Sequence, residues 1–478
     1  MTIKSDATVL EAPKDAHPLR EHGTRKSRRV IAGAEPTGLE ATFNFDDLFF
    51  SSTDLKGVIT AGNRTFYRIS EYSAAEAIGQ AHNIIRHPDM PRVVFKLLWD
   101  YLHAGKDILA YVVNKSKSGK HYWVLALVSP VKNASGEVTE FISVRIKPSS
   151  PILNQVKDLY KAMLAAEETG GMEAAGQVLG EALEGLGLKD YDEFMSVVLR
   201  AELGHYLDNG IFRNLARDSA MGNGHAQDHL RNSFSKVISS QEVSISMLAD
   251  LFAAFDTLNN LFDSTRHFFD LLKDSSMNIA ISASKLDGNA SSSLSPIAFE
   301  LINLSSSVAH MVEDFHSVMI STKAASNRLD LNLRRSLVFS ALVKMQLCGD
   351  NDDDGGKSTF LRAAATISDT SLLSIDEGLR ELRSSRSKLQ DFISRKLGGF
   401  LVSSGFLCTQ GIIQSNVWNA THVINTLTEL QELTGNIETQ IDEASLLFIQ
   451  IDEVLANIAR VIFQVQSASE RLDETRPT

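Results

Sequence analysis

Cysteine is nearly absent from this chain of 478 residues, which contains only Cys348 and Cys408. Two isolated cysteines form no CxxC pair, so the sequence offers neither a zinc motif nor a disulfide framework. Such sparse cysteine usage is typical of proteins that work in a reducing compartment. We therefore expect the chain to be cytoplasmic.

An excess of basic residues is also lacking, because 47 Lys and Arg face 59 Asp and Glu and the net charge is −12. Nucleic-acid binding requires a basic face, so nucleic acid is not an expected partner. One basic cluster, Arg25, Lys26, Arg28 and Arg29, lies in a polar N-terminal segment without the apolar core of a signal peptide. We interpret residues 1–38 as a disordered leader, with contact to a membrane surface as the alternative.

Hydrophobic runs suited to a bilayer are lacking as well. The nearest candidate is the uncharged stretch 398–420, which is interrupted by serine, threonine, glutamine and asparagine. So many polar groups are too costly for a bilayer core. We predict no transmembrane segment and interpret this stretch as part of a helical core.

Catalytic motifs are the last notable absence. The sequence contains no HExxH, no GxSxG and no Cys/His nucleophile pattern. Residues 355–358 partly match a phosphate-binding loop, but the four aspartates at 350 and 352–354 would repel a phosphate. The chain is therefore not expected to be an enzyme.

What the sequence does contain begins with a compact, mixed segment over residues 40–148. Strand patterns over 48–53 and 57–61 precede helical patterns over 63–69, 74–78 and 92–104. Three longer strand patterns then follow over 108–114, 121–131 and 138–146, with Gly119 and Gly136 at the turns. This order predicts a small α+β domain.

Helical patterns replace strand patterns after Pro148 and Pro151. We predict a helical connector over 150–225, which glycines interrupt, and then a heptad-patterned hairpin over 228–345 that breaks at residues 287–289. One row of the first arm steps by seven residues through Phe234, Gln241, Leu248, Phe255, Phe262 and Phe269.

The last quarter of the chain has its own seam. After an acidic loop over 346–357, we predict a C-terminal helical bundle or coiled coil over 358–478. One of its rows steps by seven through Leu430, Ile437, Ala444, Ile451, Ile458 and Val465. Such seams bury apolar faces within or between chains, so we expect a homodimer or higher oligomer.

Residues 48–148 resemble the PAS domain of bacterial aerotaxis receptors. The resemblance rests mainly on the run from Arg86 to Pro91, which reads Arg-His-Pro-Asp-Met-Pro. The 52–57 stretch, the Tyr122-Trp123 pair and the final Ser143-Val144-Arg145 match in the same order. The resemblance implies a fold class of N-terminal α+β PAS domain followed by an all-α region.

Members of this family bind flavin adenine dinucleotide (FAD) and report its redox state. The resemblance implies that the matching positions of this chain bind the cofactor: Asn63, Arg86, His87, Asp89, Trp99, Asn114 and Trp123. Ile108 stands where family members often carry a tryptophan. Haem through His82, His87 or His103 and a cavity without a cofactor are the alternatives.

The hairpin around 277–305 is similar, more faintly, to the signalling tip of methyl-accepting chemotaxis proteins. The similarity implies a chemotaxis kinase and its coupling protein as partners, although the charged tip of that family is replaced here by residues 288–293, Gly-Asn-Ala-Ser-Ser-Ser. The leading hypothesis is a soluble sensor of redox state, oxygen or energy level. The alternative is a non-catalytic PAS adaptor or scaffold that holds no redox cofactor.

Overall fold

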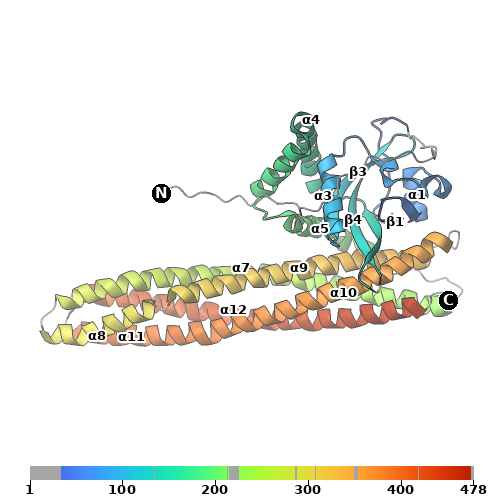
Figure 1. Cartoon of the computed structure of the whole chain (residues 1–478). Helices are drawn as coiled ribbons and strands as arrows, with labels where there is room; N and C mark the ends of the chain where they lie inside the picture. The colour runs from blue at the N-terminus through green and yellow to red at the C-terminus, as the bar shows by residue number, and fades with distance from the viewer. Residues whose placement is uncertain are drawn as a thin grey trace.

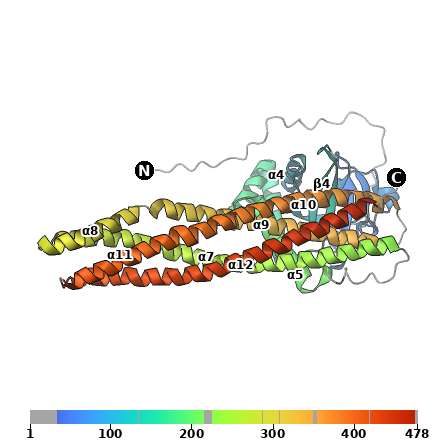
Figure 2. The ribbon, with the colours of Figure 1, turned by 90° about the horizontal axis from the view of Figure 1, so that it is seen from below.

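A computed structural model describes residues 34–133, 135–212, 214, 225–285, 288–306, 308–348, 354–417 and 419–474. Figure 1 shows an N-terminal α+β domain seated on one end of a long rod of helices. The view from below shows the helices of the rod running side by side away from this domain (Figure 2). The predicted division into an α+β domain and an all-α region is confirmed.

The N-terminal domain is built on one antiparallel sheet. Its strands are β1 (Phe49–Thr53), β2 (Ile59–Gly62), β3 (Ile108–Lys115), β4 (His121–Lys132) and β5 (Val138–Ile146), in the order β2-β1-β5-β4-β3. The chain therefore crosses from one edge to the other between β2 and β3, and helices cover that crossing. The five strands lie within one or two residues of the predicted ranges.

Short helices fill the crossover. They are α1 (Arg64–Ser70), α2 (Ala74–Ala77), the 3₁₀ helix η1 (His82–Ile85) and α3 (Arg92–His103). Local chemistry sets their starts: the Asn63 side chain accepts a hydrogen bond from the Phe66 backbone N–H, and Ser73 and Glu76 form a capping box. The longest of them, α3, is placed to cover one face of the sheet.

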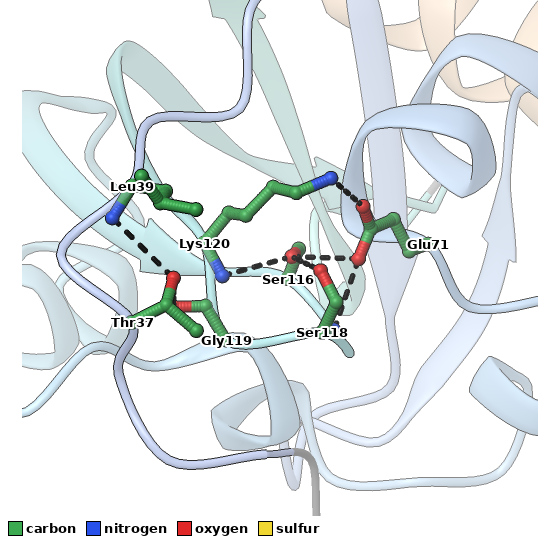
Figure 3. Close-up of polar contacts among 7 residues, drawn as sticks. All are labelled: Thr37, Leu39, Glu71, Ser116, Ser118, Gly119 and Lys120. Atoms are coloured by element: carbon green, nitrogen blue, oxygen red, sulfur yellow. Dashed lines mark hydrogen bonds and ion pairs between the residues drawn. The ribbon is translucent and has the colours of Figure 1, made fainter.

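The β3–β4 hairpin is held by polar contacts around Glu71, which follows α1 (Figure 3). Its carboxylate accepts hydrogen bonds from Ser116 and from the Ser118 backbone, and it pairs with Lys120 at 2.9 Å. On the other side, Thr37 donates to the Gly119 carbonyl. Residues 34–38 are therefore ordered, against the expectation of a leader through residue 38, and the basic cluster at 25–29 lies outside the described residues.

The described part of the connector includes the helices α4 (Ile152–Gly185) and α5 (Tyr191–Asp208). Gly171 interrupts α4 with a positive φ of 70°, so the predicted glycine break falls inside one bent element. Glu167 of α4 accepts the Val93 backbone N–H at the start of α3, at 2.9 Å. The connector thus fastens to the domain that precedes it.

The rod is a bundle of long helices. They are α7 (His225–Ser284), α8 (Gly288–Ser306), α9 (Val308–Cys348), α10 (Asp354–Asp391), the π-helical turn η2 (Phe392–Leu397), α11 (Gly398–Val417) and α12 (Thr421–Glu474). Helix α7 packs along α8 and α9, as the two heptad arms predict, and α12 packs along α7, α10 and α11. The predicted acidic loop is shorter than expected, because α9 extends to Cys348 and α10 begins at Asp354.

The seams found in the sequence form the core of the rod. Phe234, Gln241 and Leu248 are buried on α7, and Leu430, Ile437 and Ile451 are buried on α12. Gln241 lies in this core with its amide donating to Ser336 at 2.8 Å. One stretch within Ala363–Val417 is long and apolar enough to cross a membrane by length and composition, and a third of it is buried inside the bundle.

The α+β domain contacts the rod through the face of its sheet opposite to α3. Phe50 of β1 packs against Phe360 of α10 with ring centroids 4.3 Å apart, and Asp107 pairs with Arg335 of α9. Arg200 of α5 pairs with Asp330 of α9 at 3.0 Å. The two parts are therefore joined by both apolar and ionic contacts.

Candidate functional site

A cavity of about 330 Å³ lies between the sheet and the helices that cross it. Strands β1, β3, β4 and β5 supply its floor, including Val112, Asn114 and Arg145, while α3 supplies Phe95 and Trp99. Its volume lies at the lower end of the range for small-molecule sites. The walls are mostly apolar and a few polar groups point inward, which is the composition of a ligand site.

Positive charge without negative charge is the main electrostatic feature of this cavity. Lys56, Arg86 and Arg145 line it, and its described lining residues include no aspartate and no glutamate. Lys56 is exposed, Arg86 is partly buried and Arg145 is 2% exposed. The cavity is therefore suited to a ligand that carries negative charge or presents several acceptors.

Arg145 lies on β5 at the inward position two residues after Ser143 and four after Phe141. Its guanidinium donates to Ser51 Oγ at 2.9 Å and to His82 Nε2 at 2.8 Å. Among the described residues, no carboxylate lies within ion-pair distance of it. Burial lowers the pKa of Arg145 to about 10, so the group is still a cation at neutral pH.

His82, in η1, is held neutral by the same arrangement. Burial, followed by the positive charge of Arg145, lowers the pKa of His82 to about 3. Because a guanidinium can only donate, Nε2 of His82 must accept, which places the imidazole proton on Nδ1. His82 is therefore an acceptor that orients Arg145 and is not available as a proton donor at Nε2.

Asn114 and Arg86 meet where β3 passes η1, and their backbones form an isolated bridge. The side-chain amide nitrogen of Asn114 is buried in the cavity wall and has no hydrogen-bond partner among the described residues. A buried donor without a partner is costly, and a ligand acceptor would satisfy it. Arg86 donates to the Met90 carbonyl at 2.9 Å and lies 4.8 Å from the Phe95 ring centroid.

Trp99 forms the apolar end of the cavity. It packs edge-on against Phe141 at 5.7 Å and stacks on His103 at 5.6 Å. Gly57 approaches the indole so closely that a Cβ there would lie 3.2 Å from the ring, and its φ of 75° also favours glycine. The tight turn after β1 therefore allows the indole to close this side of the cavity.

The opposite face of the same sheet carries a second polar cluster, centred on Glu202 of α5. Glu202 is fully buried and accepts hydrogen bonds from the Tyr111 hydroxyl and from the backbone N–H groups of Ser149 and Ser150. Tyr111 lies on β3 next to Val112, which faces the cavity. The cavity is thus separated from this cluster by the thickness of one strand.

The structure places three of the seven residues predicted to bind a cofactor at the cavity: Arg86, Trp99 and Asn114. Asn63 instead accepts from the Phe50 and Phe66 backbones and donates to the Leu48 carbonyl. His87 accepts the Asp89 backbone N–H, and the Asp89 side chain is 74% exposed. The side chains of Asn63 and His87 bond to nearby backbone groups, and none of the three residues is among those that line the cavity.

Trp123 lies on the other side of the sheet, 5.9 Å from the Tyr160 ring of α4 and 5.5 Å from the Lys157 ammonium group. It therefore belongs to the contact with the connector. Its distance from the cavity follows from strand alternation, because Val124, Ala126 and Val128 take the other face of β4. That these residues bind a cofactor stays a prediction, and the geometry favours the three that line the cavity.

Sequence reasoning did not select Arg145 or Lys56 as site residues, although Arg145 ends one of the matching motifs. A signal was present in the alternation of β5. Phe141, Ser143 and Arg145 share one face, which makes Arg145 a cation at an inward position between the buried Val144 and Ile146. An inward arginine without a nearby acid is rare enough to mark a ligand site.

Comparison with known proteins places the α+β domain. Residues 59–145 match the family model described as PAS fold. The aerotaxis receptor of Escherichia coli strain K12 is 38% identical over 120 residues, which are 25% of this chain and 24% of that protein. The nitrogen fixation regulatory protein of Klebsiella pneumoniae is 26% identical over 95 residues, covering 20% of this chain and 19% of that protein.

Phototropin-1A of Oryza sativa subsp. japonica is 26% identical over 82 residues, covering 17% of this chain and 9% of that protein. A solved structure of the blue-light photoreceptor Aureochrome1 LOV in its light state is 21% identical, covers 24% of this chain and 91% of that chain, and has a TM-score of 0.22. This chain thus spans a quarter or less of the curated relatives named here. The family model and the curated relatives support a PAS domain of the type found in signal-transduction sensors.

Proposed function

We propose that this chain is a non-enzymatic signalling receptor, located in the cytoplasm, whose PAS cavity binds FAD and whose helical rod relays the redox state of that cofactor to a signalling partner. The observation that carries the proposal is Arg145, a buried cation in the cavity wall without a carboxylate partner. Burying an uncompensated charge is costly, and a ligand with acceptor atoms offsets that cost.

The residues present suit a flavin. The apolar walls around Trp99 suit a flat heteroaromatic ring, while Asn114 and Arg145 offer donors to its polar edge. Arg86 and the exposed Lys56 would hold the pyrophosphate at the mouth. A bound flavin supplies reversible redox chemistry, and the protein supplies orientation and electrostatics.

Haem is less well supported than flavin. His82 is the histidine among the residues that line the cavity, and its Nε2 is already engaged by Arg145 and Ser51. An axial ligand needs a ring nitrogen that is free to bind the iron, and Nε2 of His82 is not free. His87 is buried outside the cavity lining, and its Nδ1 accepts the Asp89 backbone N–H.

The relay follows from the sheet. A change in the charge of the ligand would alter the interaction with Arg145 and Asn114, which lie on β5 and β3. Those strands carry Tyr111 and the 149–150 segment that Glu202 holds, and Asp107 just before β3 pairs with Arg335 of the rod. A bias of a few kcal/mol between two packings is sufficient for such a signal.

The absorption spectrum of the purified full chain, before and after dithionite, tests the proposal. We expect flavin bands that bleach on reduction. Arg145→Met and Asn114→Leu should each weaken flavin binding at least about tenfold, because each removes a buried donor from the site. Matched controls are Arg68→Met, at an exposed arginine, and Trp123→Leu, on the opposite face of the sheet.

Three results would contradict the proposal. A colourless protein that takes up no added FAD would favour the adaptor function, in which the self-contained contacts of Arg145 with Ser51 and His82 are structural. Equal loss of flavin in the Arg145 and Trp123 variants would show that the effect is general unfolding. A haem absorption band would replace the flavin with a different cofactor.

A further inference from the structure

The end of the rod far from the PAS domain contains almost no charge. Residues 397–428 include no Asp, Glu, Lys or Arg, in a chain of which 22% is charged. The neighbouring stretch of the sequence, 275–306, contributes three such residues, Lys285, Asp287 and Glu300. Helix surfaces in water normally carry charge at many positions, so this end is unusual for a free surface.

Helix α11 exposes its larger apolar side chains. Val402 is 69% exposed, Phe406 61%, Ile413 57% and Val417 63%. With Thr409 and Asn416, these exposed positions step by four and three residues along the helix. That spacing is the heptad pattern of a packing seam, and here it faces outward.

After Phe400 and Leu401, which are buried at its start, the inner face of α11 is made of smaller groups. Ser404, Cys408, Gly411 and Ser415 are buried against the rest of the rod. At Gly411 an added Cβ would lie 2.6 Å from the Leu427 side chain, so α11 and α12 approach closely there. The helix therefore has two seams, an inner one that packs inside the chain and an outer one whose large apolar side chains are each more than half exposed.

Lipid does not suit the outer seam. Gln431 of α12 donates to Thr409 in the middle of the seam, and Glu429 and Glu432 flank Gln431 with exposed carboxylates. On α7, Lys273 and Asp274 are exposed close to Phe269, which packs against Phe400 at 5.0 Å. Inserting α11 into hydrocarbon would carry these charges into it, at several kcal/mol in total.

We propose that the outer seam of α11, formed by Val402, Phe406, Thr409, Ile413, Asn416 and Val417, binds the same seam of a second copy of this chain. Two copies with a net charge of −12 each repel one another over most of their surfaces. The end that includes residues 397–428 has few charges, so the repulsion is weakest there, and apolar area is available. Because the seam is its own complement, a two-fold contact buries it, and none of the six residues that form it carries a charge.

Sedimentation equilibrium of the full chain over a range of concentrations tests the proposal. We expect reversible dimers for the wild-type chain. The double variant Phe406→Glu, Ile413→Glu should dissociate at least about tenfold more readily, because it puts two carboxylates from each copy into the contact. Both positions are exposed, so the helix content by circular dichroism should be unchanged.

A matched control uses apolar residues that are equally exposed elsewhere on the rod. Leu373 of α10 is 70% exposed and Phe463 of α12 is 69% exposed. The double variant Leu373→Glu, Phe463→Glu should dimerise with a dissociation constant within about twofold of that of the wild type. An equal loss of dimers in this control would show that total charge, rather than the α11 seam, governs association.

Cross-linking gives a second readout that does not depend on weakening the contact. Thr409 lies near the middle of the seam. In a two-fold dimer it therefore lies next to Thr409 of the second copy, whether the two helices run parallel or antiparallel. In a Cys348→Ser background, Thr409→Cys should form disulfide-linked dimers on mild oxidation, and Leu373→Cys should not. The remaining Cys408 is buried, and burial raises the pKa of its thiol to about 12, which suppresses its reaction.

Several outcomes would overturn the proposal. A wild-type chain that remains monomeric at high micromolar concentration would exclude self-association. Unchanged dimers in the Phe406→Glu, Ile413→Glu variant, together with no cross-link at residue 409, would place the interface elsewhere. A monomer that sediments with vesicles of neutral phospholipid, and loses that binding in the same variant, would assign the seam to lipid.

Discussion

The PAS cavity and the far end of the rod reverse the usual distribution of polarity in opposite ways. The cavity encloses Arg145, a cation that is 2% exposed and has no described acid beside it. The end of the rod instead exposes Phe406 and Val402, which are 61% and 69% exposed, in a segment without charge. Charged groups normally lie outside and large apolar groups inside, so each region has the character of a binding site for a second molecule.

The difference between the regions indicates what kind of molecule each one takes. The cavity is concave and small, and its polar groups point inward from three strands and a short helix, which suits one ligand in one orientation. The outer seam of α11 is long and has no enclosed polar group, which suits another helix. The predictions below test how independent the two regions are, beginning with the contact that joins the PAS domain to the connector.

Replacing Glu202 should have the largest effect. Glu202→Ala removes the acceptor for Tyr111 and for the backbone N–H groups of Ser149 and Ser150, all of which stay buried or partly buried. We expect the free energy of unfolding of the PAS domain to fall by about 3 kcal/mol. Urea denaturation followed by the fluorescence of Trp99 and Trp123, in a Trp418→Phe background, measures it.

Glu173→Ala, at an exposed glutamate of α4, is the control for this prediction and should change the free energy of unfolding by less than about 0.5 kcal/mol. If the two variants behave alike, the Glu202 cluster does not hold the connector to the domain. The PAS domain and the rod would then be independent in stability, and the relay through β3 would lose its support.

The inside and the outside of the rod can be compared on one helix. Leu430 of α12 is fully buried, whereas Leu446 of the same helix is 63% exposed. Leu430→Ala should lower the free energy of unfolding of the rod by about 3 kcal/mol, since it leaves a cavity, and Leu446→Ala by less than about 0.5 kcal/mol. Thermal unfolding followed by circular dichroism should separate them, and equal effects would mean that the exposed apolar residues pack within the chain.

The sequence was sufficient to predict the sheet and the seams. The strand over 138–146 was located to the residue, because alternation along β5 is bounded by the turn at Gly136 and by Pro148. Regular patterns of this kind depend on local periodicity, which a single sequence contains. The heptad row through Leu430, Ile437 and Ile451 was located correctly for the same reason.

The site and the outer seam could be predicted only in part. Asn63 was assigned to the cofactor although an asparagine just before a helix is also an N-cap, and the structure uses it as one. The partners of Arg145, namely Ser51 and His82, are 94 and 63 residues away along the chain. In α11 both the 401–404–408 row and the 402–406–409 row satisfy a heptad, so the sequence alone does not say which faces inward.

The neutral state of His82 should appear as a pH dependence of stability. The pKa of His82 is about 3 in the folded chain and 6.5 in the unfolded chain. Its contribution to the free energy of unfolding is therefore fully present above pH 6.5 and is lost as the pH falls toward 3. We expect the free energy of unfolding of the PAS domain to fall by about 1 kcal/mol between pH 7 and pH 5.5. His82→Gln should remove most of this slope, and a change at the exposed His103 should not.

The smallest expected effect concerns Glu71, at the hairpin in Figure 3. Burial raises the pKa of Glu71, but hydrogen bonds from Ser118, Lys120 and Ser116 outweigh it and lower the pKa to about 2. Because the folded pKa lies below 4.5, the contribution is present above pH 4.5 and is lost as the pH falls toward 2. Solvent screens this partly exposed carboxylate, so we expect about 1 kcal/mol.

Urea denaturation of the PAS domain at pH 6 and at pH 3 checks this effect. Glu71→Gln should lose stability at pH 6 and show a smaller difference between the two pH values than the wild type, whereas Glu40→Gln, at an exposed position, should match the wild type. If the difference in unfolding free energy between pH 6 and pH 3 is the same in Glu71→Gln as in the wild type, solvent screening has removed the contribution of this carboxylate to stability. The polar contacts that stabilise the PAS domain would then be the buried ones alone. That result would sharpen the contrast between the buried charge of the cavity and the exposed apolar side chains of α11.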